Sequence, residues 1–138
     1  MSDGQQNTHP RIAVINDDND FLSLMEQVLT DEGYDVDLMR TFSLAHEKVR
    51  DSQPDAVILD IVAGQQERGW AILELIRLDP RTTRIPVIVC SAAVAALEER
   101  RAVLESQGII ALAKPFDLDM LLRAVGEALA RRESVAHV

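Results

Sequence analysis

Apolar runs and helical patterns alternate along most of this chain. Five short, mainly apolar runs predict strands at residues 11–15, 34–39, 56–59, 86–90 and 109–113. Apolar residues spaced three and four apart predict helices after these runs, at residues 21–29, 43–52, 69–79, 94–107 and 118–129. Five strand–helix units in succession are typical of an α/β fold, here a doubly wound, five-stranded parallel sheet with helices on both faces.

The polarity of each run indicates its place in the sheet. The last three runs are almost entirely apolar, as the central strands of parallel sheets are. The run at 34–39 alternates polar and apolar side chains, which predicts one solvated face and a place near the sheet edge. Gly108 is expected just past the fourth helix, because glycine accepts the left-handed conformation that often follows a helix.

The length of 138 residues suits one domain with a sizeable core. We expect a flexible N-terminal leader at residues 1–10, the folded domain at 11–131 and a C-terminal tail at 132–138. No apolar run approaches the roughly 20 residues that a membrane-spanning helix needs. The single cysteine, Cys90, lies in an apolar run, which predicts a buried structural thiol and fits a reducing compartment.

The net charge of −9 at pH 7 argues against a general nucleic-acid binder. Phosphate backbones attract basic surfaces, and this chain has an excess of acids. We therefore expect a cytoplasmic protein that contacts neither a membrane nor nucleic acid directly.

Polar residues mark the ends of four predicted strands. Asn16 and Asp17 follow the first strand, Asp60 the third, Ser91 the fourth and Lys114 the fifth. The carboxyl ends of parallel strands share one edge of the sheet, and ligands bind beyond that edge. The sequence therefore predicts that acids, a hydroxyl and a lysine converge on a single site.

These residue types fit phosphoryl chemistry. Clustered carboxylates repel one another unless a cation lies between them, and Mg²⁺ accepts a few carboxylates together with water and phosphate oxygens. A lysine and a hydroxyl could hold the remaining oxygens of a phosphoryl group. An aspartate can itself act as the nucleophile and form an aspartyl-phosphate, and Asp60 is the candidate.

Four segments then resemble a known family. "AVINDDND", "AVILDI", "VIVCSAA" and "LAKPFD" are similar to the signature segments of the receiver domain of two-component response regulators. The resemblance covers roughly residues 11–131. It implies the flavodoxin-like (βα)5 fold with strand order 2-1-3-4-5.

The resemblance also implies a role for each site residue. Asp60 would be the phosphoacceptor. Mg²⁺ would be bound directly by Asp17 and by the backbone carbonyl of Val62, and through water by Asn16. Ser91 and Lys114 would contact the phosphoryl group. The expected function is a stand-alone response regulator, not an enzyme acting on other molecules. Its donor would be a histidine kinase or a phosphotransfer protein, and its output a downstream protein effector. It would be a monomer, or a weak homodimer through the fourth helix, fifth strand and fifth helix.

Several positions depart from the family pattern. Asn16 stands where an acid is usual, and Ala111 where an aromatic switch residue is usual. The loop after Asp60 has Gly64 in place of a proline and is one residue longer than usual. Val62 and Ala93 occupy positions that, in the family, set the rate at which the aspartyl-phosphate is hydrolysed. Apolar side chains there would hinder the attacking water, so we expect a long-lived phosphorylated state.

Two alternatives remain open at this point. A phosphorylation-independent interaction module of the same fold is favoured by Asn16, the altered loop and Ala111. A haloacid-dehalogenase-like phosphatase also uses a strand-end aspartate, but it needs a second aspartate where this chain has Val62. The neighbouring acids Asp18 and Asp20 are expected to be solvated at the start of the first helix.

Overall fold

The computed structural model of the chain describes residues 9–61 and 68–136. Ten elements alternate along it: β1 (Arg11–Ile15), α1 (Asn19–Asp31), β2 (Asp35–Met39), α2 (Ala45–Ser52), β3 (Ala56–Asp60), α3 (Gly69–Leu78), β4 (Val87–Ser91), α4 (Val94–Ser106), β5 (Ile110–Ala113) and α5 (Leu118–Ala136). Each predicted strand and helix is present. Two strands extend one residue further than expected, so Asp60 and Ser91 are the last residues of β3 and β4.

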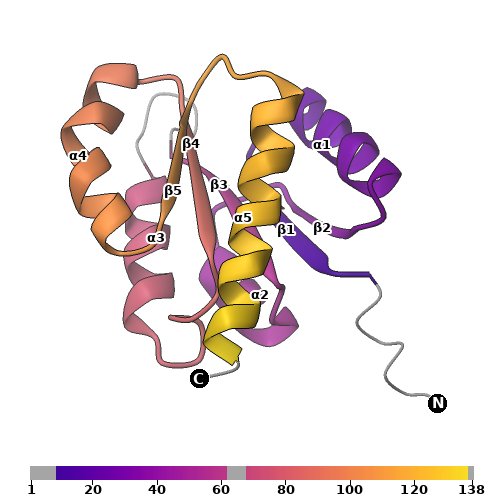
Figure 1. Ribbon diagram of the computed structural model, residues 1–138, viewed down its shortest axis with the longest axis horizontal. Coiled ribbons are helices and arrows are strands. Elements are labelled where there is room, and N and C mark those ends of the chain that lie inside the picture. The colour runs from indigo at the N-terminus through magenta and orange to yellow at the C-terminus, as the bar shows by residue number, and fades with distance from the viewer. Residues whose placement is uncertain (1–8, 62–67, 137–138) are drawn as a thin grey trace.

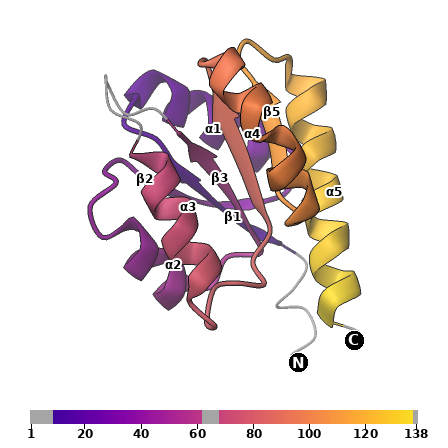
Figure 2. The ribbon, with the colours of Figure 1, turned by 90° about the vertical axis from the view of Figure 1, so that its left-hand side faces the viewer.

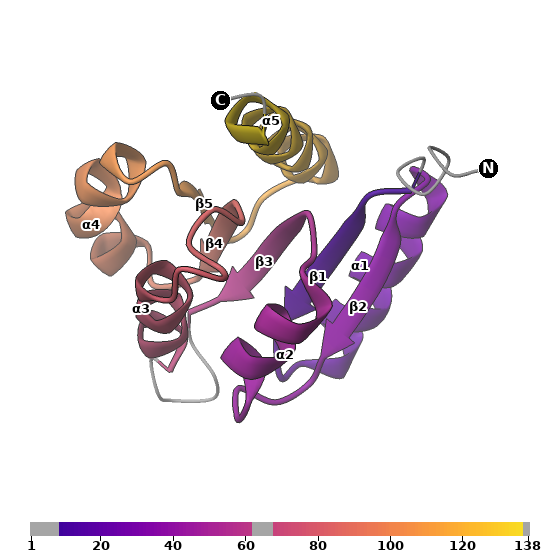
Figure 3. The same cartoon turned by 90° about the horizontal axis from the view of Figure 1, so that it is seen from below.

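The five strands form one parallel sheet in the order β2-β1-β3-β4-β5. Helices α1 and α5 cover one face, and α2, α3 and α4 cover the other (Figures 1 and 3). Figure 2 shows the sheet between these two layers of helices. The expected doubly wound α/β architecture is confirmed.

Alternation along the buried strands builds two apolar layers. In β1, Ile12 and Val14 pack with α1 and α5, whereas Ala13 and Ile15 belong to the layer with α2, α3 and α4. All four side chains are fully buried. Successive side chains of a strand point to opposite faces, so a central strand must be apolar on both.

The apolar composition of the run at 109–113 indicated a central strand, but β5 lies at the sheet edge, as the strand order implied by the resemblance requires. Its apolar composition has another cause. Helix α4 packs along β5, and α5 covers its other face, so Ala111 and Leu112 are buried although the strand has only one neighbour.

The last helix is longer than its apolar pattern indicated. Helix α5 continues to Ala136, so residues 132–136, expected in a C-terminal tail, are helical. The segment contains neither glycine nor proline, and nothing in its local sequence stops the helix. The fourth helix, by contrast, ends before Gly108, whose φ of 78° is the left-handed conformation expected there.

No helix within residues 9–61 and 68–136 has the length and apolar character needed to cross a bilayer.

A polar cluster fastens α2 to the end of α3. The Asp79 carboxylate accepts hydrogen bonds from the Arg81 backbone N–H at 2.9 Å and from Arg81 Nε at 3.1 Å. His46 Nε2 of α2 lies 2.8 Å from Asp79 Oδ2. The hydrogen bonds from Arg81 are the main reason that the pKa of Asp79 falls to about 2.

Helix α3 begins in close contact with the end of β3. The Gly69 N–H donates to the Ile61 carbonyl at 2.8 Å. A Cβ at position 69 would lie 2.5 Å from the Asp60 carbonyl oxygen and would also overlap Ile61 Cα. Only glycine fits at this crossing, and the crossing holds α3 beside the strand end that presents Asp60.

Replacement of Gly69 by alanine is expected to destabilise the fold by about 1–3 kcal/mol, because its Cβ would meet rigid backbone. Gly126, in α5, has no atom within 4 Å of an added Cβ and serves as the matched control. Gly126→Ala should be neutral or stabilising by about 0.5–1 kcal/mol, since alanine has less backbone freedom to lose in a helix. Urea unfolding of both variants measures this. Equal stability of the two variants would contradict the close packing at Gly69.

The Asp79 cluster gives stability a defined pH dependence. A carboxyl group whose pKa is lowered by folding, here from 3.8 to about 2, contributes stability that is present above the unfolded value and lost as the pH falls through the folded value. Urea midpoints measured between about pH 5 and pH 2 should fall less steeply for Asp79→Asn than for the wild-type chain. Asp31→Asn, an exposed acid at the end of α1, is the control. Parallel curves for the wild type and Asp79→Asn would contradict the assignment.

Candidate functional site

The carboxyl edge of the sheet brings the predicted polar residues to one end of the fold. Asp60 and Ser91 end β3 and β4, while Asn16 and Lys114 directly follow β1 and β5. The Lys114 N–H donates to the Ser91 carbonyl at 2.8 Å, which ties the ends of β4 and β5 together. The peptide bond between Lys114 and Pro115 is cis.

Asp60 and Lys114 form the central ion pair. Lys114 Nζ lies 3.4 Å from Asp60 Oδ2, and the Asp60 side chain is only 9% exposed. Lys114 Nζ also lies 4.7 Å from the centroid of the Phe21 ring in α1. The ammonium therefore makes both an ion pair with a carboxylate and a cation–π contact with an aromatic ring.

Sequence reasoning missed the role of Phe21. The helical spacing marked it only as an apolar residue of the first helix. Its contact with Lys114 joins two elements at opposite ends of the sequence, and nothing in the spacing of either segment signals it.

Asn16 is level with Asp60 in the sheet. The register pairs Ile15 with Leu59, so the next residues along, Asn16 and Asp60, stand side by side on the face covered by α1 and α5. The Asn16 side chain is buried, and its Oδ1 accepts a hydrogen bond from the Asp18 N–H at 2.8 Å. Its Nδ2 is buried with no hydrogen-bond partner among the described residues. A donor without an acceptor therefore lies beside the Asp60 position.

The remaining predicted site residues differ in their burial and in their contacts. Ser91 is buried, and its Oγ accepts a hydrogen bond from the Ala93 N–H at 3.0 Å on the way into α4. Asp17 is exposed. Asp18 caps the first helix, accepting from the backbone N–H of Asp20 at 2.9 Å. Val62, the expected backbone ligand, lies outside the described residues.

The carboxylates at this edge of the sheet suit a Mg²⁺ ion that is bound by few protein ligands. Within the described part of the chain, no three or more histidine, cysteine, aspartate or glutamate side chains are grouped closely enough to hold a metal ion. Asp60 and Asp17 offer hard carboxylate oxygens, and Mg²⁺ keeps several waters when it binds to one or two carboxylates. The unpartnered Asn16 Nδ2 is a hydrogen-bond donor and cannot be a metal ligand.

Cys90 pairs with Asp60 in the register of β3 and β4. The pKa of its thiol is raised to about 12, mainly by burial; the Lys114 charge acts to lower this pKa and the Asp60 charge to raise it. The thiol is therefore a packing group beside the site, as the sequence indicated, and not a nucleophile.

Comparison with known proteins identifies the class. The family model of the response regulator receiver domain matches residues 12–126. The chain therefore belongs to the receiver domains of response regulators, and the resemblance noted in the sequence is confirmed.

The similar curated proteins are longer regulators. The transcriptional regulatory protein PrrA of Mycobacterium tuberculosis is 33% identical over 94% of this chain and 54% of its own length. The DNA-binding dual master transcriptional regulator RpaA of Synechocystis is 29% identical over 91% of this chain and 52% of its own length. The chain thus spans about half the length of these relatives.

Solved structures of similar proteins share the fold. A CheY-like response regulator receiver domain protein from Methanospirillum hungatei matches with a TM-score of 0.75 and 25% identity, over 91% of this chain and 98% of that one. The receiver domain of a sensor histidine kinase from Pseudomonas aeruginosa, solved with magnesium coordinated in its active-site cleft, matches with a TM-score of 0.73 and 24% identity, over 88% and 98%.

Thiol labelling tests the setting of Cys90. Because a pKa of about 12 leaves almost no thiolate at pH 8, a disulfide reagent is expected to label the native chain roughly a thousandfold more slowly than the urea-unfolded chain. The absorbance of the released thiolate follows the reaction. Rapid labelling under native conditions would show that this end of β4 is open to solvent.

Proposed function

We propose that this chain receives a phosphoryl group on Asp60 from a phosphohistidine, carried by a histidine kinase or a phosphotransfer protein, and signals through contacts with other proteins. The single observation that carries the proposal is the nearly buried Asp60 carboxylate at the end of β3, 3.4 Å from Lys114 Nζ. Asp60 acts as the substrate of the transfer. The domain assists this reaction but has no substrate of its own beyond the phosphoryl group.

In this mechanism an Asp60 carboxylate oxygen attacks phosphorus, the nitrogen–phosphorus bond breaks, and its electron pair returns to the donor imidazole. Asp60 and Asp17 would hold Mg²⁺, with the Val62 carbonyl as a further ligand and Asn16 near its waters. When bound, the ion neutralises the charge on the transferring oxygens.

Lys114 and Ser91 then stabilise the product. Lys114 neutralises Asp60 before transfer and lies close enough to pair with a phosphoryl oxygen afterwards. The Ser91 hydroxyl oxygen already accepts from the Ala93 N–H, so its own O–H is available to donate to the phosphoryl group. Movement of these two residues toward the new charge would shift the population of two packings on the α4-β5-α5 side.

An apolar hollow beside Lys114 supports docking of a phosphodonor protein. It has a volume of about 410 Å³ and is lined by Phe21, Leu24, Pro115 and Leu118, among others. Leu24 is 46% and Leu118 42% exposed. Exposed apolar residues gathered next to a reactive group favour a protein partner that covers the site during transfer.

The first test is intact mass spectrometry after incubation with acetyl phosphate and Mg²⁺. We expect one added phosphoryl group on the wild-type chain and none on Asp60→Asn, with Asp31→Asn as the matched acid control. Lys114→Ala should slow the reaction roughly a hundredfold, as removal of a positioned charge typically does. If the wild-type adduct persists for hours, the expected effect of Val62 and Ala93 on hydrolysis is supported.

The absence of a phosphoryl adduct would favour the alternative function. Failure of the wild-type chain to gain a phosphoryl group, even in excess Mg²⁺, favours the phosphorylation-independent interaction module. The buried Asn16 amide is the observation that favours this second function, because an amide lies beside Asp60 where the family pattern has an acid. Asn16→Asp is then the restoring variant, and it should tighten Mg²⁺ binding by roughly tenfold.

A further inference from the structure

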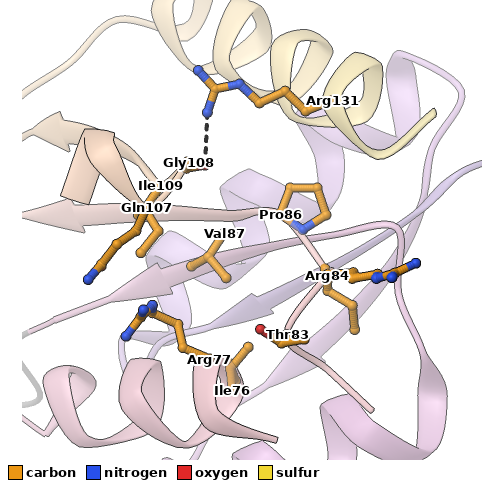
Figure 4. A pocket seen from close by; sticks show the side chains of 11 residues that line it. Ile76, Arg77, Thr83, Arg84, Pro86, Val87, Gln107, Gly108, Ile109 and Arg131 are labelled. Atoms are coloured by element: carbon orange, nitrogen blue, oxygen red, sulfur yellow. Dashed lines mark hydrogen bonds between the residues drawn. The ribbon is translucent and has the colours of Figure 1, made fainter. Parts of the chain in front are cut away.

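The opposite edge of the sheet, where the strands begin, contains a cavity of about 440 Å³. It lies between the end of α3, the starts of β4 and β5, and the later part of α5 (Figure 4). Small-molecule sites typically have volumes of roughly 300–1,000 Å³. The cavity is therefore large enough for a metabolite-sized molecule, and it is separate from the Asp60 site.

The floor of the cavity is apolar. It is formed by Ile76, Ile85, Val87 and Ile109, none more than 4% exposed. These side chains are fixed by the core of the α2-α3-α4 layer, to which all four belong. A preformed apolar surface of this kind favours an occupant with an apolar body.

The rim of the cavity is basic. Arg77 comes from α3, Arg84 from the connection between α3 and β4, and Arg131 from α5 (Figure 4). Three of the 14 basic residues of the chain thus line one cavity, while no acidic residue is among its described lining residues. The protein as a whole has a net charge of −9, so this local reversal favours an anionic occupant.

The three guanidinium groups differ in how far they are already neutralised. Arg131 donates to the Gly108 carbonyl at 2.8 Å, which fixes it over the cavity, and it pairs with Glu127 at 2.6 Å. Arg77 pairs with Glu74 at 3.3 Å. Within the described residues, Arg84 has no hydrogen-bond or ion-pair partner, and it is exposed. An anion could pair with Arg84 without breaking any existing interaction.

We infer that this cavity binds a small organic anion in which a carboxylate or phosphate is joined to an apolar body. The apolar body lies on the isoleucine and valine floor. The anionic group pairs with Arg84, whose exposed side chain can turn toward the mouth. Thr83 and Gln107 on the rim supply hydrogen-bonding groups for the rest of the molecule.

The test uses two anions with different apolar bodies, adenosine monophosphate and octanoate. Each is titrated into the ¹⁵N-labelled wild-type chain, and the amide signals are followed by NMR. At least one anion should bind saturably with shifts centred on Val87, Gly108 and Ile109. Its uncharged counterpart, adenosine or 1-octanol, should bind at least roughly tenfold more weakly, because it lacks the charge-assisted hydrogen bond.

Matched variants locate the anion. Arg84→Gln should weaken binding by roughly tenfold, while Arg123→Gln, an exposed arginine of α5 outside the cavity, makes the same charge change and should leave it unaltered. Binding of one anion alone assigns the ligand class, and binding of both supports the shared chemistry. Lack of saturable binding by either anion, equal affinity for the uncharged counterpart, or an equal loss in Arg123→Gln would overturn the inference. None of these readouts requires phosphorylation of Asp60.

Discussion

The carboxyl edge of the sheet depends on one constraint, the nearly buried carboxylate at the end of its central strand. Asp60 ends β3, the central strand of the sheet, and is only 9% exposed, so its charge needs a partner. Lys114 supplies that partner from the end of β5, and the same ammonium contacts the Phe21 ring of α1. Three elements from the beginning, middle and end of the chain thus meet because one charge is buried.

The sequence sufficed to predict Asp60 and Lys114 as neighbours because parallel strands place their carboxyl ends together whatever the side-chain details. Apolar runs likewise predicted every strand. The position of β5 at the edge was not evident from its composition, because two flanking helices bury an edge strand as thoroughly as a second neighbour would. The packing of Phe21 on Lys114, and the continuation of α5 to Ala136, depend on three-dimensional contacts or on the absence of a stop signal. Neither leaves a periodic pattern.

The two edges of the sheet differ in chemistry although the same strands join them. At the carboxyl edge, β4 ends in Ser91 and β5 leads to Lys114, and the neighbouring strand β3 ends in Asp60. At the opposite edge the same strands begin above an apolar floor with arginines around it. No spacing rule indicated this second cluster, because its three arginines come from separate segments. Strands β4 and β5 pair from Ile88 to Ser91 and from Ile110 to Ala113, and they run from one cluster to the other.

The contact between Gly69 and Ile61 has a consequence for how this domain can diverge. The chain leaves β3 and re-enters α3 at one point, since the Gly69 N–H bonds to the Ile61 carbonyl. Ile61 and Gly69 are therefore held together whatever the number of residues between them. The entropy of closing a loop grows only slowly with length, by about 0.6 kcal/mol for each doubling. Insertions between residues 61 and 69 should therefore cost the fold little stability, because the contact that fixes α3 against the end of β3 is made by residues outside the inserted segment.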